Sequence, residues 1–204
     1  NMVISAPMNE EELRNLMFTA TTYQGPFSIR YPRGQGVMPE WRTTMRNIPI
    51  GQGRIVKEGE EVAILTIGHI GNYAVEACES LEKESLSPAH YDMRFVKPLD
   101  QQLLTELATT HSHFVTIEDN ALMGGAGSAV NEYCIAEQLP VKLLNIGLPD
   151  LFIKHGTLKS CIRTHVLTYL FTHKASITIG GKCIKEDPKD FPRAQTPLSE
   201  FSGQ

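Results

Sequence analysis

The sequence lacks the features that would place it in a specialised class of protein. Its longest run without a polar side chain, from Ala121 to Gly127, is seven residues long, whereas a membrane-spanning helix needs about 20. Its 16 glycines and 12 prolines among 204 residues fall well short of a collagen-like or linker composition. We therefore expect a soluble, folded protein with one large domain, or one domain and part of another.

Neither charge nor cysteine spacing indicates a special partner. The net charge is −4 and the 19 lysines and arginines form no block, which argues against nucleic acid and membrane surfaces as partners. Four cysteines, with no C-x-x-C pair and no metal-site spacing, predict free thiols in a reducing, cytoplasmic compartment. They are Cys78, Cys134, Cys161 and Cys183.

The first 50 residues predict a short β-α-β unit followed by a linker. The start, residues 1–7, has no signal-peptide pattern and is typical of the middle of a strand, so we expect the chain to begin inside a fold. Asn9-x-x-Glu12 resembles a capping box and opens an amphipathic helix over residues 9–22. A strand follows at 27–31. These elements are too few for a sheet of their own. Residues 35–50 are aperiodic and interrupted by Gly36, Pro39 and Pro49, so they are interpreted as a surface linker.

From residue 51 to about 157, strand and helix patterns alternate. Val62 to Leu65 is a continuous apolar run, typical of a strand buried on both faces. Such alternation predicts parallel crossovers and an α/β three-layer sandwich with a mostly parallel sheet. The expected strands are 54–57, 62–65, 91–96, 114–117 and 141–146, and the expected helices are 74–81, one capped by Asp100, and 126–138.

Residues 158–204 differ in character from the rest of the chain. Residues 158–169 keep helical spacing but are rich in threonine, valine and isoleucine, which are poor helix formers. The last 23 residues, 182–204, carry three prolines and eight charges. We expect them to bury little surface and to be mobile.

Three patterns have both a chemical and a structural interpretation. The loop Gly124-Gly125-Ala126-Gly127 precedes a helix and could cradle an anion, but Glu118 and Asp119 just upstream would repel a phosphate, so close helix–strand packing is favoured. His111-x-His113 could place two imidazoles on one face of a strand, yet no further ligand is near in sequence, and exposed loop histidines are expected. Cys78 and Cys134 lie on apolar helix stripes and are interpreted as core residues.

The segment Arg30-Tyr31-Pro32-Arg33-Gly34 ends a predicted strand abruptly. Pro32 fixes its own φ and favours an extended Tyr31, so Arg33 extends from a rigid elbow. A guanidinium held in this way can meet a phosphate monoester with two parallel charge-assisted bonds. The alternative is that Arg33 is an ordinary solvated surface charge.

Four ordered motifs, the segments 30–34, 92–100, 118–128 and 144–150, give the sequence a family resemblance. It closely resembles the C-terminal part of 1-deoxy-D-xylulose-5-phosphate synthase over residues 1 to about 157. The resemblance implies that residues 1–34 are a remnant of the pyrimidine-binding domain and that 51–157 are a transketolase C-terminal domain. From residue 158 the resemblance is lost, which makes 158–204 a divergent extension.

The resemblance also carries expectations about function. Enzymes of this family use thiamine diphosphate and Mg²⁺ to join a two-carbon unit from pyruvate to glyceraldehyde 3-phosphate, act as homodimers, and serve isoprenoid, thiamine and pyridoxal biosynthesis. The family's cofactor-binding and catalytic groups precede the matched region, so this chain alone is expected to be inactive and to bind neither cofactor. Arg33 matches a family arginine that holds the phosphate of the aldehyde, whereas Arg30 is interpreted as structural.

Two other interpretations remain open on the sequence. The chain could be a non-catalytic assembly module of a split transketolase-like enzyme, pairing with a separate catalytic chain. It could also be a nucleotide-binding α/β domain, because ligands of such sheets bind at the carboxyl ends of the strands. The absence of a G-x-G-x-x-G motif weighs against the nucleotide interpretation.

Overall fold

The computed structural model describes residues 1–83, 85–152, 156, 178–179 and 182–183. Residues 1–153 form one compact unit, and the remaining residues form a second. Within the described residues, no helix is long and apolar enough to cross a membrane.

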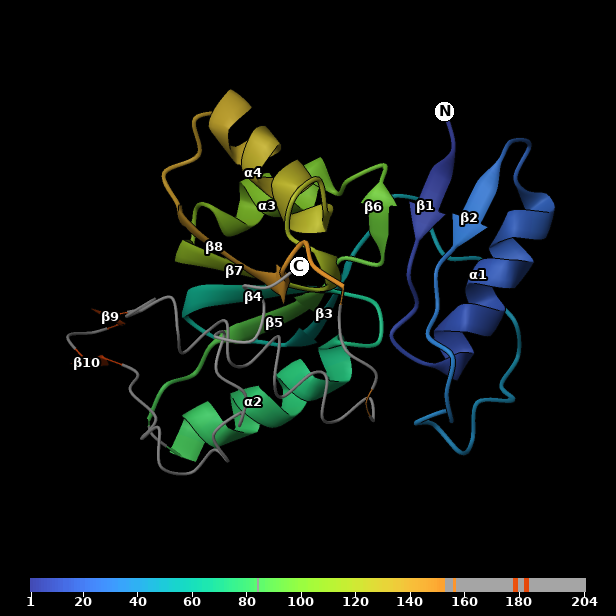
Figure 1. Ribbon diagram of the computed structural model, residues 1–204, viewed down its shortest axis with the longest axis horizontal. Helices are drawn as coiled ribbons and strands as arrows, with labels where there is room; N and C mark the ends of the chain where they lie inside the picture. Colours follow the sequence, from blue (N-terminus) through green and yellow to red (C-terminus); the bar gives the residue numbers. More distant parts are fainter. Residues whose placement is uncertain (84, 153–155, 157–177, 180–181, 184–204) are drawn as a thin grey trace, which may run out of the picture. The chain divides into compact units, whose positions relative to one another are not determined.

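A five-stranded sheet is the centre of the first unit (Figure 1). Its strand order is β3-β5-β4-β7-β8, and every neighbouring pair is parallel except β3 with β5. The sheet is therefore mostly parallel, as predicted. The strands are β3 (Arg54–Lys57), β4 (Glu61–Ile67), β5 (Ala89–Asp92), β7 (His111–Ala121) and β8 (Lys142–Leu148).

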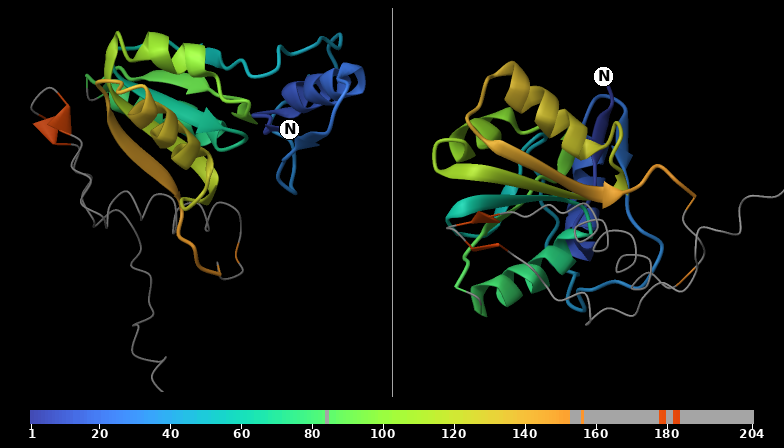
Figure 2. Two further views of the ribbon diagram at one scale, coloured as in Figure 1. Left: turned by 90° about the horizontal axis from the view of Figure 1, so that it is seen from above. Right: turned by 60° about the vertical axis from the view of Figure 1, so that its left-hand side comes forward.

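Helices cover both faces of this sheet. Helix α2 (Gly71–Lys83) lies on one face, and α3 (Gln101–Leu107) and α4 (Ala126–Ala136) lie on the other. Figure 2 shows the strands in succession between α4 and α2. The predicted three-layer α/β sandwich is confirmed, and Asp100 caps α3 as expected, its carboxylate accepting from the Leu103 amide.

The N-terminal β-α-β unit is completed by a strand from later in the chain. It consists of β1 (Val3–Ser5), α1 (Glu10–Thr22) and β2 (Phe27–Ile29). Its parallel β1–β2 pair becomes a three-stranded sheet because β6 (Phe95–Lys97) adds antiparallel to β1. The prediction of one strand over 91–96 was wrong, since Arg94, with a φ of 58°, separates β5 from β6.

Helix α1 begins with half of the predicted capping box. The side chain of Asn9 accepts from the Glu12 amide at 2.9 Å, as expected. The Glu12 carboxylate, however, accepts from the amide of Met8 at 3.0 Å instead of from that of Asn9. This places Glu12 in the interior, where it contacts the large sheet.

Apolar side chains fill the space between the layers of the sandwich. Leu65, Leu104 and Phe114 are fully buried in one continuous cluster. Cys78 and Cys134 are buried free thiols, and burial raises the pKa of both. The prediction that they are core residues is confirmed. Cys161 and the side chain of Cys183 lie outside the described residues.

The linker between β2 and β3 runs alongside α1. Its residues are mostly exposed, with neither helix nor strand, as predicted. Hydrogen bonds nevertheless fasten it: the amide of Arg46 donates to Asn15 Oδ1 at 3.1 Å, and that of Ile48 donates to Thr19 Oγ1 at 2.8 Å. Ile48 is itself buried.

The second unit is described at five residues: residue 156 and the strands β9 (Thr178–Ile179) and β10 (Lys182–Cys183), which pair antiparallel. The predictions of helical spacing over 158–169 and of mobility over 182–204 otherwise lie outside the described residues.

Candidate functional site

A cleft lies at the topological switch point of the five-stranded sheet, where successive strands are added first on one side of β4 and then on the other. The chain moves from β4 to β5 on one side and then returns to β7 on the other side of β4. The carboxyl ends of β4 and β7 border such a switch point, the usual place for ligands in parallel sheets. The N-terminal β-α-β unit lines the opposite side of the cleft. The cleft is lined by Ile4, Ser5, Ala6, Arg30, Ile67, Val96, Glu118, Asn120, Gly124, Gly125 and Ala126.

A protein carboxylate fills the anion-binding end of α4. Glu118, which is buried, accepts from the backbone amides of Ala126 at 2.8 Å and Gly127 at 2.9 Å. Burial raises the pKa of Glu118 against the opposing effect of these two amides. The amides that could cradle a phosphate are therefore already used.

Close packing explains the glycines of this loop. A Cβ on Gly125 would collide with the Glu118 carboxylate, and one on Gly127 would lie 2.6 Å from Thr116 Oγ1. This confirms the packing interpretation of the loop and weighs against the nucleotide-binding one.

The N-terminus of α2 is likewise covered from within the chain. The Asn72 side chain donates to the carbonyl of Met8 at 2.8 Å. Gly68, at a φ of +81°, brings the turn after β4 close to Ala6, where an added Cβ would lie 3.1 Å from the Ala6 Cβ. Residues of this chain therefore lie against the N-terminal ends of both α2 and α4 at the switch point.

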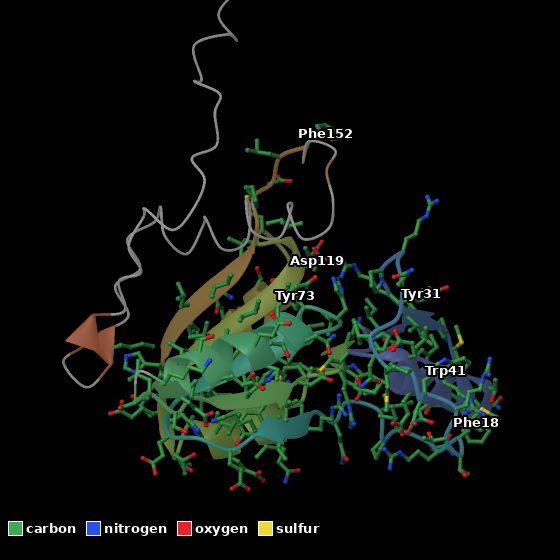
Figure 3. All side chains as sticks on the ribbon, turned by 90° about the horizontal axis from the view of Figure 1, so that it is seen from below. Phe18, Tyr31, Trp41, Tyr73, Asp119 and Phe152 are labelled. Carbon is green, nitrogen blue, oxygen red and sulfur yellow. The ribbon has the colours of Figure 1, made fainter. Side chains whose placement is uncertain are left out.

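Arg30 joins the N-terminal unit to the β7–α4 loop. Its guanidinium donates to the carbonyl of Asp119 and lies 3.9 Å from the Asp119 carboxylate. His69 Nε2 lies 3.6 Å from the same carboxylate. Burial lowers the pKa of His69, which Asp119 partly opposes and Arg30 reinforces. These contacts agree with the structural role expected for Arg30. Figure 3 labels Asp119 and also Tyr31, the residue that follows Arg30 in the sequence.

Arg33 lies in the irregular segment that follows β2. The residue is exposed, as are the adjacent Pro32 and Gly34. The segment stands beside the cleft because its first residue, Arg30, lines it. Arg33 is therefore accessible to a ligand, and its phosphate-binding role stays a prediction.

A buried cluster of charges, which sequence reasoning missed, connects α1 to the large sheet. Arg54 Nε lies 3.1 Å from Glu12 Oε1 and 3.3 Å from Asp92 Oδ2, and Arg94 Nε donates to Glu12 Oε1 at 2.7 Å. Burial and the Glu12 charge raise the pKa of Asp92. Burial opposes ionisation of Glu12, but Arg54, the Met8 amide and Arg94 together hold its pKa below the usual value.

The histidine pair differs from its prediction. His111 and His113 lie on β7 and not on a loop, and His111 is buried with its ring edge-on to Tyr91. The register of the β4–β7 pairing shifts between Glu61, which pairs with His111, and Val62, which pairs with His113. The regular pairing of the two strands is therefore interrupted between the two histidines. Among the residues that the structure describes, no group of three or more His, Cys, Asp or Glu is arranged to hold a metal ion.

The described residues do not fit thiamine diphosphate with Mg²⁺. A diphosphate needs free backbone amides or cations, yet Glu118 occupies the first two backbone amides of α4. Mg²⁺ needs a set of oxygen ligands, and the described part of the chain offers no such cluster. The described residues therefore supply no catalytic step through this cofactor.

The fold and its sequence define a class of protein. The family described as Transketolase, C-terminal domain matches residues 51–169. The chain belongs to this family.

The similarity extends to particular relatives. The chain is 54% identical over 158 residues to 1-deoxy-D-xylulose-5-phosphate synthase of Cytophaga hutchinsonii, which covers 76% of this chain and 25% of the relative. It is 49% identical over 159 residues to the synthase of Bacteroides thetaiotaomicron, covering 77% and 25%. The matches lie in the C-terminal region of these proteins, so the chain spans about a quarter of their length. The family resemblance seen in the sequence is confirmed.

A solved structure agrees with the fold. The chain described as "Split gene transketolase, inactive beta4 tetramer" superposes with a TM-score of 0.71 at 30% identity. The alignment covers 81% of this chain and 52% of that one.

Proposed function

We propose that this chain is the C-terminal part of a thiamine-diphosphate-dependent 1-deoxy-D-xylulose-5-phosphate synthase. The complete enzyme would convert pyruvate and glyceraldehyde 3-phosphate to 1-deoxy-D-xylulose 5-phosphate and CO₂, for isoprenoid, thiamine and pyridoxal biosynthesis. The observation that carries the proposal is the 54% identity to a curated synthase over 158 residues. A cytoplasmic homodimer is proposed on the same basis.

The contribution of this chain is architecture and one substrate contact. Residues 1–34 complete a pyrimidine-binding domain, and residues 51–157 form the C-terminal domain. The exposed guanidinium of Arg33 binds the phosphate of the aldehyde, since its planar fork matches two phosphate oxygens. The groups that bind the cofactor and carry out the chemistry come from the preceding part of the enzyme.

The cofactor part of the proposal is tested by calorimetry. Thiamine diphosphate with Mg²⁺, titrated into the 204-residue chain, is expected to give no binding at micromolar concentrations, because Glu118 already uses the amides of the α4 N-terminus. Micromolar binding by the chain alone would contradict this division of roles.

The role of Arg33 is tested in a completed enzyme, a chimaera in which the preceding three quarters of the Cytophaga hutchinsonii relative are joined to this chain. Arg33→Ala is expected to raise the KM for glyceraldehyde 3-phosphate about 10- to 100-fold, because a charge-assisted contact contributes about 1.5–3 kcal/mol. If the remote phosphate also helps the carbon–carbon step, kcat falls as well.

Two comparisons give this test its control. Arg33→Lys should recover part of the loss, since lysine keeps the charge but not the fork. Unphosphorylated glyceraldehyde and pyruvate decarboxylation should be little affected. Equal losses on both aldehydes would mean that Arg33 serves the fold only.

A second candidate function is supported by the split-gene neighbour. This chain would then be a non-catalytic assembly module that pairs with a separate chain bearing the thiamine site. Co-purification distinguishes the two: a module retains a distinct thiamine-binding polypeptide, whereas a fragment of a single-chain synthase needs its own preceding segments.

A further inference from the structure

The segment that carries Arg33 is held at both ends. At its start, the backbone amide of Arg30 donates to the carbonyl of Ser5 at 2.8 Å, and its guanidinium contacts Asp119. A second attachment begins four residues beyond Arg33, at the amide of Val37. The stretch between these anchors contains Pro32, whose ring fixes its φ angle.

Glu10, in the first turn of α1, makes the second attachment. One carboxylate oxygen accepts from the amide of Val37 at 3.0 Å, and the other accepts from the amide of Met38 at 2.8 Å. Backbone amides that meet an ionised acceptor form the stronger class of hydrogen bond. Glu10 therefore clamps the chain just after Arg33.

The clamp depends on a glycine at position 36. A Cβ on Gly36 would lie 2.6 Å from Cδ of Glu10, so a side chain there must displace the carboxylate. Gly34, two residues earlier, has open space around it. The close approach is thus specific to the site of the clamp.

We propose that Glu10 is a positioning residue for Arg33: by fixing Val37 and Met38, it sets where the exposed guanidinium meets the phosphate of the aldehyde. The inference rests on the proposed function. Displacements of about 1 Å in a binding group can cost as much as 100-fold in rate, so a clamp on the backbone four and five residues away has a measurable effect.

The first measurement uses the 204-residue chain alone. In Glu10→Ala, amide hydrogen exchange at Val37 and Met38 is expected to accelerate at least ten-fold, since both amides lose their acceptor. Glu11→Ala is the matched control, because Glu11 lies in the same first turn but pairs with the exposed Arg46 at 3.4 Å. Unchanged exchange in Glu10→Ala would overturn the clamp.

The second measurement uses the chimaera described above. Glu10→Ala is expected to raise the KM for glyceraldehyde 3-phosphate about ten-fold while leaving the KM for unphosphorylated glyceraldehyde within two-fold. Glu10→Gln should give an intermediate value, because its amide oxygen can still accept one of the two bonds. A loss on both aldehydes would assign Glu10 a merely structural role and overturn the proposal.

A mutant cycle isolates the shared contact. Gly36→Ala should reproduce the effect of Glu10→Ala, the double variant should be no worse than either, and Gly34→Ala should resemble the wild type. Additive losses would overturn the proposal.

Arg33→Ala separates the two levels of inference. If it raises the KM for the phosphorylated aldehyde and Glu10→Ala does not, the positioning role is overturned and the proposed function stands. If Arg33→Ala itself has no effect, the phosphate role of Arg33 is wrong, and the positioning role fails with it.

Discussion

Two regions of the first unit are held together by different forces. The interior of the sandwich is apolar: six of the seven residues of β4 are buried, and Phe114 of β7 packs among leucines and valines. The junction between α1 and the large sheet is instead built from Glu12, Arg54 and Asp92, together with Arg94.

The two kinds of contact have different consequences: apolar burial stabilises the fold, whereas the ion pairs favour one orientation of α1 on the large sheet. Apolar burial is non-directional and favours any dense packing, whereas buried ion pairs are favourable only in one geometry. Next to this junction β1 pairs with β6, and Arg30 contacts the β7–α4 loop.

The largest expected effect is in the apolar interior. Phe114→Ala should lower the free energy of unfolding by about 3–5 kcal/mol, because it removes a fully buried ring and leaves a cavity. Chemical denaturation measures the change. Ile135→Ala, at a side chain that is 73% exposed, is the control and should change stability by less than about 0.5 kcal/mol.

A loss of about 3 kcal/mol is expected at the junction. Glu12→Ala leaves Arg54 and Arg94 without their shared carboxylate in a largely buried site. Denaturation measures the stability, and amide exchange in β1 should accelerate more than exchange in β4. Uniform acceleration across both strands would show that the junction is not a separate structural element.

A pH effect of about 2 kcal/mol is expected beside the junction. Burial, reinforced by Arg54, lowers the pKa of His90 from 6.5 to about 4. The unfolded chain takes up a proton below about pH 6.5 and the folded chain does not, so this stability is present above pH 6.5 and lost as the pH falls toward 4.

The His90→Gln variant measures this term. Its stability relative to the wild type, determined by denaturation at pH 7 and pH 5, should improve by about 2 kcal/mol at the lower pH. An unchanged difference between the two proteins would contradict the lowered pKa.

The smallest effect is expected at the surface of α1. Glu11→Ala removes the pair with Arg46, whose side chain is 71% exposed, and should cost at most about 1 kcal/mol. If this variant were as destabilised as Glu12→Ala, burial would not explain the importance of the junction.

Local patterns predicted most of the elements correctly. The apolar run at 62–65 became β4, the cap at Asp100 became the start of α3, and the glycine loop became the start of α4. Each depends on neighbours in the sequence, which periodicity and capping rules describe directly.

The errors and omissions share a non-local cause. β6 exists because it pairs with β1, about 90 residues away, and the cluster of Glu12, Arg54 and Asp92 joins three distant segments. His111 is buried because β7 extends beyond its predicted start to pair with Glu61. No local pattern reports such pairings. For Arg33, the sequence supplies the rigid elbow, and only the family resemblance supplies a ligand.

We propose that this chain is a necessary but catalytically incomplete part of a 1-deoxy-D-xylulose-5-phosphate synthase. The most direct test is product formation from pyruvate and glyceraldehyde 3-phosphate by this chain alone, by the preceding three quarters of the Cytophaga hutchinsonii relative alone, and by the chimaera. We predict product with the chimaera only. Turnover by this chain alone, or full activity of the preceding part without it, would contradict the claim.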